Sequence, residues 1–304
     1  MRRAVYAAAA GACAAGAARL AYSAMNRRPP GGPKAWSRTN HRGEPVTLLE
    51  GPAVAAGASV GVLAQASLAA AYGPTGSSGS SGWRRAAATV LGGAGAAAFG
   101  AHDDLAGSGD RRGFRGHLGA LRQGEVTTGA VKLGGIGLTG VVSAALAGGS
   151  PADVILNAGL VAGGANLLNL FDLRPGRAIK VAVASGTLLS AAGRDSVAAP
   201  LGAALALLPE DLGERAMLGD AGANALGAML GASAAGLSRP ARVALLAGIA
   251  GLTAASEKVS FTKVIARTPA LNWLDMLGRR SAPQPSAPQP PPVTIRAQQP
   301  EPAG

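Results

Sequence analysis

Three short segments of the chain carry carboxylates and amides of the kind that a hard metal ion prefers. Each segment lies directly after or directly before a long uncharged run. Their polar residues are Asp103, Asp104, Asn166, Asn169, Asp172 and Asp220. A step of three residues turns back by about 60° on a helix, so Asn166, Asn169 and Asp172 share one stripe. Mg²⁺ is usually held by one or two carboxylates together with substrate phosphates. The segments therefore predict a Mg²⁺ site, with Mn²⁺ as an alternative ion.

Each segment also has a purely structural explanation. Asp220 can cap the helix that begins after it, because Asp accepts hydrogen bonds from the first amides of a helix. Asp103 and Asp104 can form a solvated helix end, and the two Asn side chains can hydrogen-bond between helices. The interpretation as one site requires that the three segments meet at one face of the protein.

Basic side chains lie close to these segments in the sequence and are suited to phosphate. Arg recognises phosphate through two parallel hydrogen bonds. The residues expected to bind substrate are Asn166, Asn169, Arg38, Arg115, Arg177, Lys263 and Arg267. The same positive charges are also explained by membrane topology or by attraction to anionic lipid.

Nine apolar segments of about 14–24 residues lie between the charged clusters and must position these groups. Only 14% of the 304 residues are charged, against about 25% in an average globular protein. A spanning helix needs about 20 apolar residues. The sequence therefore predicts an all-α, polytopic membrane helix bundle with about nine transmembrane helices over residues 1–280. Residues 281–304 contain eight Pro and are expected to be a disordered tail.

Composition excludes several other classes of protein. One Cys rules out an internal disulfide framework, and three His make a His-rich metal site improbable. The net charge of +12 is diluted among apolar runs, which argues against a nucleic-acid partner. The remaining soluble alternative is an Ala-rich helical protein, although nine runs with at most one charge each are hard to bury in one soluble core. An oligomer is compatible with the sequence.

The distribution of charge predicts which face of the membrane carries the site. With nine spans, one face receives 19 of the 28 Lys and Arg residues and the other receives seven. The positive-inside rule makes the richer face cytoplasmic. Fourteen of the 16 Asp and Glu residues fall on that same face or at its edge. We therefore expect a multi-pass cell-membrane protein with a cytoplasmic active face.

The order of these motifs resembles the polyprenyl-phosphate N-acetylhexosamine-1-phosphate transferase superfamily, over roughly residues 36–270. Asp103 and Asp104 match its Asp-Asp motif, and Asp220 matches the Asp of its Gly-Asp-Ser-Gly-Ser motif. The stretch from Asn166 to Asp172 matches the first half of its "NxxNxxDGxDG" motif. Two features depart from the pattern: Pro175 replaces a second Asp, and no His cluster follows residue 256.

The resemblance implies a function. Members use Mg²⁺ to transfer a sugar-1-phosphate from a UDP-sugar to a polyprenyl phosphate on the cytoplasmic side, releasing UMP, in cell-envelope glycan synthesis. Asp103, Asp104 and Asp172 would then be catalytic, with Asp104, Asp172 and Asp220 at the metal. The lipid phosphate is already largely ionised at pH 7, so Asp103 is expected to position groups or act through the metal rather than as a base. The alternative is a catalytically inactive membrane protein that binds a lipid phosphate or assists envelope assembly.

Overall fold

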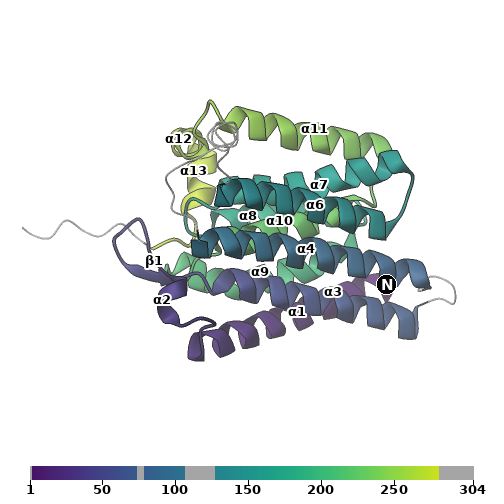
Figure 1. Cartoon of the computed structure of the whole chain (residues 1–304), viewed down its shortest axis with the longest axis horizontal. Helices are drawn as coiled ribbons and strands as arrows, with labels where there is room; N and C mark the ends of the chain where they lie inside the picture. The colour runs from purple at the N-terminus through teal and green to yellow at the C-terminus, as the bar shows by residue number, and fades with distance from the viewer. Residues whose placement is uncertain (1, 74–78, 107–126, 281–304) are drawn as a thin grey trace, which may run out of the picture.

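The computed structural model describes residues 2–73, 79–106 and 127–280. Arg115 and the predicted disordered tail at 281–304 lie outside the described residues. The long helices run side by side in one bundle (Figure 1). In chain order they are α1 (Arg2–Arg27), α3 (Glu50–Tyr72), α4 (Ser80–Ala106), α6 (Thr128–Ala147), α7 (Pro151–Phe171), α8 (Arg177–Ala191), α9 (Ala198–Leu212), α10 (Gly219–Ala234) and α11 (Arg239–Ser256).

Short elements gather at one end of the bundle, which we call the hairpin end. Strands β1 (Ser37–Thr39) and β2 (Pro45–Thr47) form an antiparallel pair there, preceded by α2 (Pro33–Trp36). The Asn40 side chain accepts hydrogen bonds from the amides of Arg42 and Glu44 at 2.8 and 2.9 Å, which closes the turn between the strands. The helices α12 (Phe261–Arg267) and α13 (Pro269–Met276) follow α11. A single-turn 3₁₀ helix, η1 (Asp195–Val197), is the exception, because it follows the other end of α8 and precedes α9.

The protein is all-α apart from this small hairpin, as the sequence predicted. Four of the described helices, namely α1, α3, α6 and α7, are long and apolar enough to cross a membrane. A fifth span results if α11 and α12, which meet at a bend of 94°, form one broken span. The expected number of about nine is therefore not confirmed. Helices α8, α9 and α10 have only 15, 15 and 16 residues, which is shorter than the roughly 20 that a simple span needs.

Helix α10 is the central helix of the bundle. All of its residues except Asp220 and Ala232 are buried, and it packs on α3, α4 and α7. Small residues permit this close packing. A Cβ atom added at Gly227 would come within 2.7 Å of the Ala165 Cα and would overlap the Gly164 carbonyl. The start of α10 therefore has a fixed position relative to the ends of α4 and α7.

Helix α7 ends as its sequence predicts. A residue before proline disfavours helical backbone, so Pro175 predicts an end near Leu173. The last helical residue is Phe171, and Asp172 is the C-cap, with its amide bonded to the Asn169 carbonyl at 3.1 Å. Asp172 is thereby placed at the hairpin end.

Candidate active site

Two of the predicted site carboxylates lie at the start of α10. Asp104 Oδ1 accepts a hydrogen bond from the Asp220 amide at 3.2 Å, and its Oδ2 accepts one from the Ala221 amide at 3.0 Å. The Asp172 carboxylate lies close enough to the Gly219 amide for that amide to lower its pKa. Carboxylates are stabilised at a helix N-terminus by free amides and by the helix dipole. The structure therefore brings Asp104, Asp172 and Asp220 together, from three different parts of the chain.

Glycines allow this close approach. Gly219 has a φ of 62°, a left-handed conformation that favours Gly. A Cβ atom at Gly219 would also lie 3.1 Å from Asp104 Oδ2. A Cβ atom at Gly100, one turn before Asp104, would lie 2.6 Å from the Asp220 carbonyl carbon. Both positions therefore require a residue without a side chain for α4 to place Asp104 against α10.

Lys132, on α6, joins Asp103 to Asp220. Its ammonium nitrogen lies 2.7 Å from Asp103 Oδ2 and 2.6 Å from Asp220 Oδ2. Sequence reasoning missed this role, although Lys132 is the one charged residue of the apolar segment at 129–152 that precedes Asp153. The available signal was that an ionisable residue inside such a segment is costly and commonly functional.

Replacing Lys132 by Met is expected to lower the free energy of unfolding by ~2 kcal/mol, because hydrogen bonds to charged groups contribute about 1.5–3 kcal/mol. The side chains of Lys132, Asp103 and Asp220 are 14%, 16% and 24% exposed, so solvent screens the pair only partly. Thermal unfolding in detergent would measure the loss. Adding Asp220→Asn to Lys132→Met should restore part of the lost stability, since one carboxylate left without its cation is removed. An unchanged melting temperature in Lys132→Met would contradict the bridge between Asp103 and Asp220.

Burial and mutual repulsion alter the acidity of the grouped carboxylates. Burial raises the pKa of Asp104 to about 7, and the charge of Asp220 adds to the effect. Burial also raises the pKa of Asp172 well above its usual range, with the charges of Asp211 and Asp220 as further causes. A positive charge that enters the site stabilises the ionised form of these carboxyl groups. The carboxylates are therefore suited to binding a metal ion or a cationic group.

The predicted substrate-binding residues are divided between several places. Arg38 donates to the backbone carbonyl of Asp104 and so lies beside the carboxylate group. Arg177 is buried, and its guanidinium is bound to both Asp275 oxygens at 2.7 and 3.0 Å and to Thr262. Lys263 and Arg267 are exposed on α12. Arg177 therefore joins α8 to the C-terminal helices instead of facing the carboxylates.

The two Asn residues of the predicted stripe lie along α7 as expected. The Asn166 amide donates to Thr253 on α11 at 3.3 Å, which is the interhelical hydrogen bond that the structural explanation predicted. The Asn169 backbone carbonyl receives the Asp172 amide. The stripe thus supports the end of α7 and its contact with α11.

A cavity of about 100 Å³ with both apolar and charged residues in its wall opens beside Asp172. Asp211, Glu214, His41 and Arg174 contribute to its wall. Glu214 is buried, has a left-handed φ of 55° and accepts hydrogen bonds from Arg42 and Asn40 at 2.8 and 2.9 Å. Sequence reasoning missed Asp211 and Glu214, because nothing in their spacing shows that they meet Asp172.

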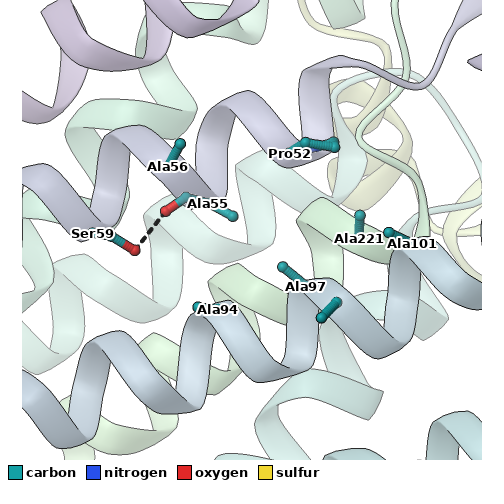
Figure 2. Close-up of a pocket in the computed structure, with 9 residues that line it drawn as sticks. Pro52, Ala55, Ala56, Ser59, Ala94, Ala97, Ala101 and Ala221 are labelled. Atoms are coloured by element: carbon teal, nitrogen blue, oxygen red, sulfur yellow. Dashed lines mark hydrogen bonds between the residues drawn. The ribbon is translucent and has the colours of Figure 1, made fainter. Parts of the chain in front are cut away.

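An apolar groove of about 250 Å³ lies between α3 and α4 (Figure 2). Alanines form most of its wall, including Ala55, Ala56, Ala94 and Ala97, and it reaches Ala101 and Ala221. Ala221 donates its amide to Asp104. The groove therefore extends along the bundle up to the carboxylate group, and its lining is suited to a hydrocarbon chain.

In the described parts of the chain, no three His, Cys, Asp or Glu side chains form a group that could hold a metal ion. The Lys132 ammonium instead bridges two of the carboxylates. The carboxylate and carbonyl oxygens present are nevertheless the donors that Mg²⁺ prefers, and Mg²⁺ often needs only one or two carboxylates besides water and phosphate.

Over the residues that the structure describes, the fold and the site define an all-α helix bundle with four or five candidate membrane-spanning helices and a carboxylate-rich site at one end. Comparison of the chain with models of known protein families and with curated proteins finds no match.

Proposed function

We propose that the protein is a multi-pass membrane enzyme that transfers a sugar-1-phosphate from a UDP-sugar to a polyprenyl phosphate. The observation that carries the proposal is the convergence of Asp103, Asp104, Asp172 and Asp220 around the start of α10. These are the residues that match the motifs of the resembled superfamily. The adjoining apolar groove supports a substrate with a long hydrocarbon chain.

The reaction needs little covalent chemistry from the protein. An oxygen of the lipid phosphate attacks the β-phosphorus of the UDP-sugar, and the bond from that phosphorus to the bridging oxygen breaks, so that UMP leaves. Catalysis of such a transfer consists mainly of positioning and neutralising charge. Arg38 and Lys132 supply positive charge beside the carboxylates. Asp104 is oriented by two amides of α10.

Asp172, Asp220 and Asp104 are the residues that would hold Mg²⁺, or Mn²⁺ in its place. The bound ion would neutralise phosphate charge in the transition state. Asp172 and Asp220 have oxygens that the amides of α10 do not engage. The ion and the Lys132 ammonium would both neutralise the Asp220 carboxylate. With the ion bound, Lys132 would be free to leave Asp220 and bind a substrate phosphate instead.

The proposal is tested by Mg²⁺-dependent release of UMP from candidate UDP-sugars in the presence of a polyprenyl phosphate. Purified protein in detergent should release UMP only when lipid phosphate, sugar nucleotide and divalent ion are all present. Chelation should stop the release, and renewed Mg²⁺ should restore it.

A non-catalytic lipid-phosphate-binding protein is the second candidate. The bridge that Lys132 forms between Asp103 and Asp220 favours it, because a fixed ammonium stabilises the carboxylates without a metal. Saturable binding of polyprenyl phosphate without release of UMP from any UDP-sugar would support this candidate against the enzyme.

The hairpin end is proposed to face the cytoplasm. Arg280 pairs with Glu44 at 2.5 Å and offers its carbonyl to Arg42, so the hairpin and the end of the described chain meet there. A topology reporter fused after Gly278 should therefore give a cytoplasmic signal. An extracytoplasmic signal would reverse the orientation but leave the grouping of the carboxylates unchanged.

A further inference from the structure

Helices α12 and α13, which we call the C-terminal helix pair, carry an exposed apolar face. All seven residues of α12 are partly or fully exposed, and in α13 Asp275 is buried. Large hydrophobic residues in the pair and directly after it are 42–64% exposed, namely Val264, Leu271, Trp273, Leu274, Met276 and Leu277. Exposed apolar surface of this kind marks a site that contacts a membrane or a partner.

Other side chains of the C-terminal helix pair fix it to the bundle. Phe261, at the start of α12, stacks on Phe171 at the end of α7, with the ring centroids 5.2 Å apart. Arg177 on α8 donates to both Asp275 carboxylate oxygens at 2.7 and 3.0 Å and to the Thr262 hydroxyl at 3.0 Å. These contacts hold α12 and α13 in one orientation, so the exposed apolar face belongs to the folded protein.

The direction of α12 places the C-terminal helix pair across the end of the bundle. Helix α11 packs on α7 and runs with the long helices to the hairpin end (Figure 1). The chain then turns by 94° between α11 and α12. In a membrane that the long helices cross, α12 therefore runs nearly parallel to the membrane surface.

The boundary between lipid head groups and acyl chains is the environment that suits the C-terminal helix pair. With seven and eight residues, α12 and α13 are too short to span the hydrocarbon core, which needs roughly 20 residues. Exposure of the six apolar side chains to water would be unfavourable. Trp is enriched at membrane interfaces, and amphipathic helices lie there in the plane of the membrane.

The charge of the C-terminal helix pair indicates which lipid it meets. Asp275, the acidic residue of the pair, is already neutralised by Arg177 and Arg279. Basic residues that take no part in these ion pairs are exposed on α12 and in the turn before it, namely Lys258, Lys263 and Arg267. Basic residues beside an apolar membrane contact attract anionic head groups. The pair is therefore complementary to an anionic lipid surface.

We propose that the C-terminal helix pair lies in the membrane surface at the hairpin end, with its apolar face inserted beneath anionic lipid head groups that Lys258, Lys263 and Arg267 contact. The pair thereby fixes the depth of the hairpin end, and with it the depth of the carboxylate site, relative to the head groups. This inference rests on the proposed membrane location of the protein and does not depend on transferase activity.

The test measures the depth of a nitroxide label in full-length protein reconstituted into lipid nanodiscs. The background variant is Cys13→Ser, which removes the one native thiol. Leu274→Cys and, independently, Met276→Cys place the label on the apolar face of α13. Ser37→Cys is the matched control, because Ser37 is an exposed strand residue at the same end of the bundle.

Electron paramagnetic resonance then compares collisions of each label with oxygen, which concentrates in the bilayer, and with a water-soluble nickel chelate. The labels at Leu274 and Met276 should collide preferentially with oxygen, and the label at Ser37 with the nickel chelate.

A second arm of the test varies the lipid head group. The Leu274 label should lie deeper in nanodiscs of phosphatidylglycerol, which is anionic, than in nanodiscs of phosphatidylcholine, which has no net charge. Combining Lys258→Gln, Lys263→Gln and Arg267→Gln should abolish this shift in depth, because the variant keeps the apolar face but loses the charges that attract the head groups.

Three results would overturn the proposal. The first is an equal ratio of oxygen to nickel collisions for the α13 labels and the Ser37 label. The second is an equal depth of the Leu274 label in the two lipids. The third is a dipolar broadening of the Leu274 spectrum that disappears on dilution with unlabelled protein, because it would show that a second copy of the chain covers the face. None of these measurements uses turnover, so failure here is distinguishable from failure of the transferase proposal.

Discussion

Asp172→Asn is expected to reduce Mg²⁺-dependent UMP release by at least about 100-fold. Removal of one preorganised electrostatic contact to the transition state typically costs about 10²–10³ in rate, and Asp172 is also proposed to bind the ion. The change keeps the size of the side chain and leaves one carbonyl oxygen near the start of α10. Folding in detergent should therefore be retained while turnover is lost, as initial-rate assays and thermal unfolding would show.

The matched control for this variant is Asp195→Asn. Asp195 lies in η1, which follows the end of α8 that is remote from Asp172. The Asp195→Asn variant should therefore release UMP at a rate within about twofold of the unmodified protein. Asp104→Asn should behave like Asp172→Asn, because Asp104 binds the neighbouring amides of α10. Near-normal UMP release in both Asp172→Asn and Asp104→Asn would count against the site.

Gly227→Val is expected to lower the free energy of unfolding by about 3 kcal/mol. Inserting methyl groups into a filled core typically costs about 1–3 kcal/mol, and here the obstruction is backbone. The Ala165 Cα lies 2.7 Å from the added Cβ position, so α7 and α10 must separate. Thermal unfolding in detergent would measure the loss.

Gly248→Val is the control for the packing argument. Gly248 lies on α11, and nothing lies within 4 Å of a Cβ atom added there. Since Val has a better helix propensity than Gly, this variant should be as stable as the unmodified protein or slightly more stable. Equal melting temperatures for the Gly227 and Gly248 variants would refute the close packing of α7 against α10.

The helical class and the grouping of the carboxylates could be predicted from sequence for different reasons. Uncharged runs show where apolar helices lie, and their alternation requires that Asp104, Asp172 and Asp220 lie at one end. The number of spans could not be predicted, because runs rich in Ala and Gly do not show where helices stop. The 15-residue helices α8 and α9 illustrate the difficulty.

The partners of individual side chains could not be predicted from the sequence either. Arg177 and Lys132 are both basic residues in or beside apolar runs, yet one binds Asp275 in a buried pair and the other joins Asp103 to Asp220. Which carboxylate each one meets depends on how the helices pack. The burial of Glu50 could not be predicted either, because it results from the close approach of Gly51 on α3 to Gly222 on α10.

The position of α10 affects how a mutational scan of this protein should be interpreted. The same helix fills the middle of the bundle and donates two of its first amides to Asp104. A substitution two or three turns along α10 can shift those amides without touching the site. Loss-of-function variants along the whole of α10 would therefore resemble site variants in an activity screen, and only a parallel measurement of protein abundance would separate the two.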